Sequence, residues 1–345
     1  TGVRATAGLA ARRVRSTIAP GGLVLMYHRI ADEPVDPSGV VVSPKSFAEQ
    51  IEVLAGLGSA VALADLVDAR KSRDRRSGSV AVTFDDGYLD NLVHARPILE
   101  REGVPATVFA VSGHIGRDIP YWWDELERIL LRPGLLADPL VVSMPDGELR
   151  WDLGAAAELT EGELAEHRSW YADANPPLTP RHKAFVELSR RLRDLPEERA
   201  EPVMAQVREA VRGEPWPRDA ERRCLSVDEL LRLGGDELVD IGAHTVTHAY
   251  LPTQAPLRQR DEIARSKREL EEMVGGPVEA FAYPYGGMSR VAQTAVREAG
   301  FRRACSTRRA AVRAGTDPLA VPRVWVGDWG GEEFERELRE AFRRC

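Results

Sequence analysis

The sequence predicts an α/β fold in which parallel strands alternate with helices around a barrel-like frame. Short apolar stretches typical of buried strands alternate with longer helical patterns over most of the 345 residues, and such alternation gives parallel strands with crossover helices. Carboxylates and histidines follow several strands, and in a (β/α) barrel the carboxyl ends of the strands meet at one rim. Composition alone leaves an open sheet as the alternative.

The first part of the chain supplies three strands and two helices. Apolar runs predict the strands, and helical spacing of apolar residues predicts the helices between them. In order, we expect a strand over 23–28, a helix over 46–57, a strand over 80–84, a helix over 89–102 and a strand over 106–111.

The same alternation resumes in the last third of the chain. It predicts a helix over 227–233, a strand over 238–242, a charged helix over 257–273, a strand over 278–282, a helix over 289–299, strands over 302–306 and 319–326, and a closing helix over 332–342.

Between residues 120 and 224 the alternation stops, and the segment has helical patterns with proline-rich joints, at 122–127, 155–172, 181–192 and 198–212. We therefore expect one domain from 1–119 and 225–345, with 120–224 as a mostly helical insertion. An insertion at the rim would act as a lid or a substrate-selecting subdomain. The alternative is an outer layer that adds stability or a dimer contact.

Composition indicates an ordinary soluble globular protein, with 43% hydrophobic and 29% charged residues. A net charge of -7 argues against nucleic-acid binding. The sequence has no apolar stretch that could span a bilayer and no apolar signal core in residues 1–20. Three cysteines without metal-type spacing favour reduced thiols. We expect a cytoplasmic protein, with secretion open if the N-terminus is trimmed, and the oligomeric state is not predicted.

Residues 83–87 (TFDDG) carry the first chemical signal. The string ends an apolar strand, and Gly87 allows a sharp turn of the backbone. The side chains of Asp85 and Asp86 should therefore point in different directions and can take different chemical roles. Taken alone, paired acids after a strand are more often a turn or a helix N-cap.

Residues 244–248 (HTVTH) carry the second signal, after another strand pattern. A helical turn there would put His244 and His248 on one face. Paired histidines also occur on solvated faces, but this chain has only seven. One carboxylate with two histidines is a catalytic zinc set with an open position. A cation held in this way acidifies its bound water, and the second carboxylate can take the water's proton. These two residue strings together therefore indicate hydrolysis of an amide or ester.

At these residues the sequence resembles the polysaccharide deacetylases with a NodB-type domain. The resemblance implies a distorted (β/α) barrel of fewer than eight strands. It implies Asp85 as the general base, and Asp86, His244 and His248 as ligands of one divalent metal, zinc with cobalt or nickel as alternatives.

Residues 281–286 (FAYPYG) are similar to the family's third motif, in part. The resemblance implies that Tyr283, Pro284 and Tyr285 line the substrate groove and that the Tyr285 backbone N–H faces the oxyanion. The family's base-orienting arginine is replaced by Ala282. Arg323, in the strand 319–326, is our candidate for that role, the alternative being a surface or interface arginine.

No histidine follows His248, so the family's usual proton donor is missing. His28 is our candidate for the general acid, because its strand should end at the same rim as Asp85. His114 is the second candidate, and a metal-bound water or a substrate group is a third solution. A histidine at a strand end also commonly serves only as a structural hydrogen-bonding residue.

Trp122 and Trp123 begin the insertion, where an aromatic surface suits the apolar face of a sugar ring, with a core role as the alternative. The sequence thus predicts a hydrolase that releases acetate from an N-acetylated amino sugar or a glycan containing one. We favour a small soluble sugar. The alternatives are a metal-dependent amidohydrolase on a non-carbohydrate amide, or a carbohydrate-binding protein with a decayed site.

Overall fold

The computed structural model describes residues 21–68, 78–212 and 222–344. The chain divides into two compact units, which we treat separately. The first consists of Thr1–Asp32, Val40–Arg117 and Cys224–Cys345, and the second of Glu33–Gly39 and Asp118–Arg223. The short segment Glu33–Gly39, which no sequence pattern singles out, thus belongs with the residues of the insertion.

A parallel sheet of seven strands forms the frame of the first unit within the described residues, in the order β13-β12-β11-β5-β4-β1-β14. A bridge between Cys305 and Val321 links the edge strand β13 to the segment that leads into β14. The sheet therefore curls back toward itself, which confirms the predicted distorted (β/α) barrel of fewer than eight strands. The strands are β1 (Gly22–Tyr27), β4 (Ser79–Phe84), β5 (Ala106–Ala110), β11 (Val239–Ala243), β12 (Ala280–Ala282), β13 (Arg303–Cys305) and β14 (Val324–Trp325).

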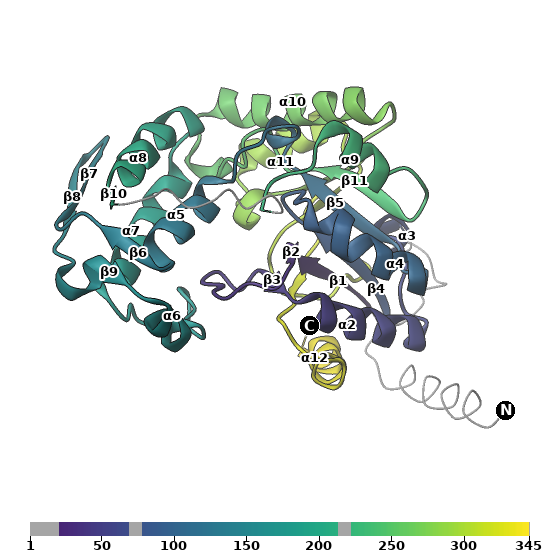
Figure 1. Ribbon diagram of the computed structural model, residues 1–345. Helices are drawn as coiled ribbons and strands as arrows, with labels where there is room; N and C mark the ends of the chain where they lie inside the picture. Colours follow the sequence, from purple (N-terminus) through teal and green to yellow (C-terminus); the bar gives the residue numbers. More distant parts are fainter. Residues whose placement is uncertain (1–20, 69–77, 213–221, 345) are drawn as a thin grey trace. The chain divides into compact units, whose positions relative to one another are not determined.

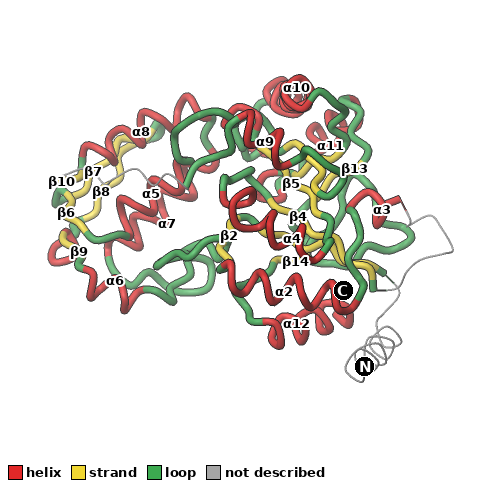
Figure 2. The backbone as a smooth tube through the Cα atoms, turned by 45° about the vertical axis from the view of Figure 1, so that its right-hand side comes forward, coloured by secondary structure: helices red, strands yellow, loops and turns green. Residues whose placement is uncertain are grey.

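Helices and single turns of helix connect these strands, and Figure 1 shows them distributed around the sheet. Helices α2 and α12 lie side by side in both Figure 1 and Figure 2, and α10 packs against α11. The bounds are α2 (Pro44–Leu57), α3 (Leu63–Asp68), η2 (Asn91–Ala95), α4 (Arg96–Glu102), η3 (Ser112–His114), α9 (Val227–Leu233), η5 (Leu251–Thr253), α10 (Pro256–Val274), η6 (Pro284–Gly286), α11 (Arg290–Glu298) and α12 (Gly331–Arg344). A short parallel pair, β2 (Arg29–Ile30) and β3 (Val41–Val42), lies beyond β1.

The two faces of the sheet belong to separate apolar clusters, as the alternation of side chains along a strand requires. Leu25 of β1 and Val82 of β4 belong to the larger cluster, which includes most of the surrounding helices. Val24 and Ala81, the preceding residues in each strand, belong to a smaller cluster that includes Phe109. Both faces of the sheet are therefore buried from solvent, which explains why the strands are near-continuous apolar runs.

The register of the central strands brings the motif residues to one edge. Tyr27 of β1 pairs with Phe84 of β4, so the next residues, His28 and Asp85, leave the sheet side by side. Ala110 of β5 pairs with Ala243 of β11, directly before the histidine string. The polar side chains predicted to follow the strands are thus gathered at a single rim.

Two predicted elements differ from the observed ones in extent. The strand expected over 319–326 pairs with β1 only at Val324–Trp325 and bridges β13 only at Val321. Pro322 lies between these contacts and has no N–H to donate. The helix expected over 89–102 begins as a π-helix, Asn91–Ala95, before α4.

The second unit has its own core and contains strands that the sequence did not predict. Its helices are α5 (Trp122–Leu131), η4 (Gly154–Ala157), α6 (Glu161–His167), α7 (Pro180–Asp194) and α8 (Glu197–Glu209). Its strands are β6 (Gly134–Leu136), β7 (Leu140–Met144), β8 (Gly147–Trp151), β9 (Glu158–Leu159) and β10 (Val211–Arg212). Strands β7 and β8 form a hairpin, and β6 lies between β10 and β9.

The helix predicted over 155–172 is wrong in its extent. Thr160 caps α6 with a capping box that includes Glu163, so this helix begins only at Glu161. The preceding residues pair with β6 instead. Ion pairs of Glu33 with Arg132 and Arg222, at 2.7 and 3.4 Å, tie the segment Glu33–Gly39 to this unit.

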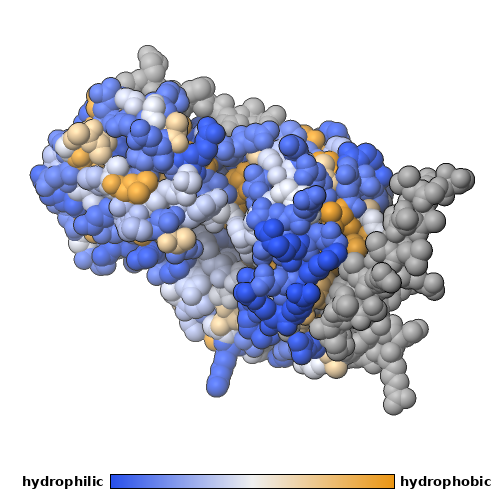
Figure 3. Space-filling view, turned by 90° about the horizontal axis from the view of Figure 1, so that it is seen from below, coloured by the Kyte–Doolittle hydropathy of each residue, from blue (hydrophilic) through white to orange (hydrophobic). Residues whose placement is uncertain are grey.

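Hydrophilic residues cover most of the face in Figure 3, and hydrophobic ones lie among them in small groups. No helix of the described residues is long and apolar enough to cross a membrane. Cys224 and Cys305 are buried and form no disulfide within the described residues, and Cys345 lies outside them.

Candidate functional site

The two acids after β4 diverge because the backbone turns sharply at this point. Asp85 still follows the strand, and its N–H donates to Tyr27 O at 3.0 Å. Asp86 and Gly87 both adopt left-handed conformations, with φ of 73° and 71°. A side chain at Gly87 would be strained there and would also approach Ala110 within 3.3 Å. The turn therefore sends the two buried carboxylates to different partners.

The histidine string after β11 is a tight loop and not the helical turn that its spacing suggested. Thr245 and His248 have left-handed φ values of 65° and 56°. The residues that follow β5 anchor this loop. Ser112 N donates to Thr245 O at 3.1 Å, and Gly113 N donates to Val246 O at 2.9 Å. These backbone turns, and not an i to i+4 face, bring the two imidazoles together.

Asp86, His244 and His248 form a buried cluster that we call the metal triad. Asp86 Oδ1 lies 3.6 Å from His244 Nε2 and 3.3 Å from His248 Nε2. One ligand atom from each residue lies within 4.8 Å of the others, the one grouping of this kind within the described residues. Three ligands on one side leave room for water or substrate on the other, as in catalytic zinc sites.

The chemistry of the triad fits a divalent cation. His244 Nδ1 contacts Ala282 O at 2.8 Å, which places the proton on Nδ1 and leaves the Nε2 lone pair facing Asp86. Burial lowers the pKa of both His244 and His248. Neutral imidazoles are the form that binds a metal, so the site is prepared for one.

Glu262 on α10 holds the histidine loop and was not found by sequence reasoning. Its carboxylate accepts hydrogen bonds from Val246 N, Thr247 N and Thr247 Oγ1, at 2.9, 2.9 and 2.8 Å. The sequence did contain a signal. Glu262 lies next to Ile263 in the buried stripe of α10, and a carboxylate in such a stripe requires a partner.

Asp85, Arg323 and His28 form a second cluster, which we call the proton group. Arg323 binds Asp85 with both ends of its guanidinium, NH1 to Oδ1 at 2.6 Å and NH2 to Oδ2 at 2.7 Å. Arg323 is only 1% exposed and also donates to Ser306 O. The structure thus places this arginine where it can orient Asp85, while Ala282 is buried and its side chain has no polar atom.

The charges of the proton group control its protonation. Burial alone would raise the pKa of Asp85, but Arg323 and the neighbouring histidines hold it below its usual value. His28 Nε2 lies 3.8 Å from Asp85 Oδ2, and burial lowers the pKa of His28 to about 4. At neutral pH the group therefore consists of a carboxylate, a guanidinium and a neutral imidazole.

His114, the second candidate for the acid, lies in η3, which follows β5. It is buried within electrostatic reach of His248, and burial lowers its pKa to about 4. His28 is the candidate that directly faces Asp85.

The third motif is divided between core and surface. Tyr283 is fully buried and its hydroxyl donates to Leu319 O at 3.1 Å, and Pro284 is buried as well. Their side chains are unavailable to a ligand, against the prediction that they line the groove. Tyr285 is 40% exposed, with a left-handed φ of 55°, and its ring lies 4.7 Å from that of His248. The oxyanion role of its N–H stays a prediction.

Trp122 and Trp123 lie in α5 of the second unit. Trp122 packs against the core of that unit, and Trp123 stacks on Tyr121 with ring centroids 4.2 Å apart. Their contact with a substrate stays a prediction.

Backbone strain is concentrated at this site. The non-glycine residues with positive φ within the described part of the chain are Asp86, Thr245, His248 and Tyr285. Such conformations cost about 1–3 kcal/mol each and persist only where the surroundings enforce them. All four belong to the metal triad, its loop or the neighbouring tyrosine.

Comparisons with known proteins agree with this geometry. The family model described as polysaccharide deacetylase matches residues 72–134 and 216–304, which include both acids and both histidines of the two motifs. YxkH of Bacillus subtilis (strain 168), a protein assigned to the polysaccharide deacetylases, is 30% identical over 95 residues. That match spans 27% of this chain and 33% of the length of YxkH.

Two solved structures share the fold. IcaB from Ammonifex degensii is 20% identical, with a TM-score of 0.56 over 94% of this chain and 98% of its own. The Streptococcus pyogenes deacetylase PplD, in complex with acetate, is 16% identical, with a TM-score of 0.55 over 93% and 99% of the two chains. The family model thus covers both motif strands of this chain, and the barrel is shared with these two structures along nearly the whole chain.

Proposed function

We propose that the protein is a metal-dependent N-deacetylase, which hydrolyses the acetamide of an N-acetylated amino sugar, or of a glycan containing one, and releases acetate. The observation that carries this proposal is the adjacency of the metal triad and the proton group at one rim. His244 Nε2 lies 4.0 Å from Asp85 Oδ2, so the two groups face the same space. A cation site next to an oriented carboxylate is the arrangement that amide hydrolysis needs.

The metal triad would hold the cation, which supplies an acidified water and an electrophile for the acetamide oxygen when bound. Asp85, fixed by Arg323, takes a proton from the attacking water as the new C–O bond forms. The Tyr285 N–H is the proposed donor to the oxyanion.

His28 completes the proton transfer. Because His28 Nε2 lies 3.8 Å from Asp85 Oδ2, the proton that Asp85 takes can pass to this imidazole. The imidazolium then protonates the nitrogen as the C–N bond breaks, which yields acetate and a free amine. A neutral resting His28 is therefore compatible with a role as general acid.

The ion pair of Asp85 and Arg323 favours an active enzyme over a decayed binding protein. A buried, bidentate pair next to a potential cation site is costly to form, and its position beside that site supports a role in the reaction. The third motif lacks the arginine that would orient the base. Arg323, in the segment that leads into β14, is the proposed replacement.

The first test is metal content per chain, by elemental analysis after identical dialysis of the wild-type protein and His248→Ala. We expect about one zinc, cobalt, nickel or iron per wild-type chain and none in the variant. His167→Ala, in the second unit, is the matched control and should keep the metal. No metal in the wild-type protein, even after reconstitution, would rule out the proposed chemistry. Acetate release from acetylated sugars then tests the substrate class.

A further inference from the structure

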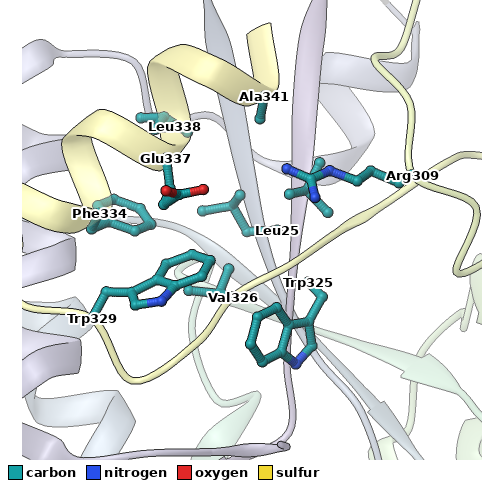
Figure 4. A pocket seen from close by; sticks show the side chains of 10 residues that line it. Leu25, Arg309, Trp325, Val326, Trp329, Phe334, Glu337, Leu338 and Ala341 are labelled. Atoms are coloured by element: carbon teal, nitrogen blue, oxygen red, sulfur yellow. The ribbon is translucent and has the colours of Figure 1, made fainter. Parts of the chain in front are cut away.

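His28 lies just past the end of β1, outside the paired part of the sheet. Apolar packing holds the strand itself. In Figure 4 the side chain of Leu25 lines an apolar pocket together with Val326, which follows β14, and Leu338 of α12. The strand ends at Tyr27, the last residue that pairs with β4. The position of His28 therefore depends on contacts beyond the strand.

Within the described residues, no hydrogen bond fixes the imidazole of His28. Its Nδ1 atom is buried and has no hydrogen-bond partner in this part of the chain. Its Nε2 atom lies 3.8 Å from Asp85 Oδ2, which is longer than a hydrogen bond. A histidine that transfers protons is commonly oriented by a hydrogen bond at its other nitrogen. Here the direction of the ring must be set through the backbone of His28.

Asp90 and Asn91 hold the backbone of the three residues that begin with His28. Asn91 Nδ2 donates to His28 O at 2.8 Å. Asp90 Oδ1 accepts from Ile30 N at 3.1 Å, and Asp90 Oδ2 accepts from Arg29 Nε at 3.0 Å. Asn91 Nδ2 also donates to Asp90 Oδ1 at 2.9 Å, which joins the two side chains. We call Asp90 and Asn91 the support pair.

The support pair does not serve the helix at which it lies. Asp90 is the residue before the π-helix η2, but its side chain makes no capping hydrogen bond, although aspartate at this position ordinarily caps a helix. Asp90 and Asn91 are 0% and 1% exposed, and such burial is costly unless the polar groups are bonded. π-Helices are rare and frequently lie at functional sites. The bonds that justify this burial are those to the segment of His28.

We propose that Asp90 and Asn91 are positioning residues, which hold His28 at the distance from Asp85 that proton transfer requires. They act through the backbone of His28 and not by contact with the reacting atoms. This inference rests on the proposed function, in which His28 receives the proton from Asp85 and passes it to the leaving nitrogen. A displacement of about 1 Å between reacting groups can lower a rate about 100-fold, so the support of a single carbonyl oxygen matters.

The test is a double-mutant cycle on acetate release from triacetylchitotriose. It compares the wild type, Asn91→Ala, His28→Ala and the double variant, each after reconstitution with zinc and with metal content checked. In the wild-type background we expect Asn91→Ala to lower kcat about 10–100-fold, with little change in KM. In the His28→Ala background the same change should lower kcat less than about twofold, because no imidazole is left to position.

Stability separates this role from a structural one. The carbonyl of residue 28 remains in His28→Ala, so Asn91→Ala should lower the thermal stability equally in both backgrounds. Equal losses of kcat in both backgrounds would overturn the inference and limit the support pair to a structural role. A wild-type kcat in His28→Ala would overturn it as well. Both results would leave the deacetylase proposal intact.

Asp90→Asn is the second variant, for use if Asn91→Ala does not fold. It keeps an accepting oxygen for Ile30 N but loses the charge that faces Arg29. We expect a smaller loss of kcat that again disappears in the His28→Ala background. Gln206→Ala, which removes an amide bonded to Ser143 O in the second unit, is the control and should keep the wild-type kcat.

A wild-type protein that releases acetate from neither this trimer nor N-acetylglucosamine would count against the proposed function and not against the positioning role. Crystal structures of the wild type and Asn91→Ala then decide the inference. An imidazole of His28 that is displaced or disordered in the variant would sustain it. An imidazole that keeps its wild-type position beside Asp85 would overturn it.

Discussion

The metal triad and the proton group share one rim but are built in different ways. The triad stands on two short loops with left-handed residues, and backbone hydrogen bonds and Glu262 hold those loops. The proton group stands on the ends of neighbouring strands, and one bidentate ion pair holds it. The first construction depends on local turns and the second on how the sheet closes.

This difference implies that a mutation can disrupt one group and leave the other intact. Loss of a loop contact should release the metal and leave the ion pair intact. Loss of the ion pair should stop proton transfer and leave the metal in place. The following experiments test this separation, from the largest expected effect to the smallest.

Asp85→Asn should break the proton group and leave the triad whole. The amide cannot accept the proton of the attacking water, so we expect turnover to fall about 10²–10⁴-fold, the range for lost general acid–base catalysis. Metal content should stay at the wild-type value by elemental analysis. Retained turnover would remove Asp85 from the role of base, and loss of the metal would show that the two groups are not separable.

Arg323→Ala should chiefly destabilise the fold. It leaves the Asp85 carboxylate buried and unpaired, which costs about 3–5 kcal/mol of the free energy of unfolding. Arg323→Lys should cost less but still lower kcat, because lysine has no fork to fix the carboxylate. Denaturant unfolding and kcat measure the two effects. Arg303→Ala, which removes another buried arginine with ion pairs to Glu279 and Asp68, is the control and should lower stability without changing kcat.

Glu262→Gln should weaken the triad and spare the proton group. The glutamine keeps the shape but replaces one accepting oxygen with an N–H₂ group, so the histidine loop loses part of its support. We expect metal affinity to fall about 10–100-fold, as for other residues that orient ligands, measured by competition with a chelator. Glu271→Gln, on the same helix and bonded to Lys267, is the comparison and should keep the wild-type affinity. Equal affinity in the wild type and Glu262→Gln would limit Glu262 to a structural role.

The smallest effect concerns pH. Burial lowers the pKa of both histidines of the triad below the ordinary value of 6.5. Protons compete with the metal only where the imidazoles become charged, so a lowered pKa extends metal retention to lower pH. We expect the metal to stay bound at pH 6.5 and to be released only below it, in a stepwise dialysis followed by elemental analysis. Half-release above pH 6.5 would contradict the effect of burial.

The sequence predicted the barrel and the triad because both depend on local patterns. Apolar runs and their helices follow from periodicity, and Asp86, His244 and His248 belong to two strings of five residues each. The conformation of the histidine loop was not predictable from spacing. Its left-handed residues depend on β5's neighbouring segment and on Glu262, which are distant in sequence.

Contacts across the sheet were harder to predict. Arg323 reaches Asp85 only because β1 lies between β4 and β14, and periodicity does not give strand order. Tyr283 was expected to line the groove, but its ring is buried in the core and its hydroxyl donates a hydrogen bond to Leu319 O. In the second unit, Thr160 ends the preceding strand and begins α6, where the helical composition of 155–172 suggested one continuous helix.

The position of Arg323 also sets an order of events during synthesis. The metal ligands are complete once residue 248 has been made, but the partner of the base comes 75 residues later, in the segment that joins the two edges of the sheet. Glu262 and Ala282, which hold the histidines of the triad, also precede Arg323 in the chain. The contacts described for the triad are therefore all synthesised before the counter-ion of Asp85. Under the proposed mechanism, Asp85 is therefore oriented for the reaction only after the two edges of the sheet have come together.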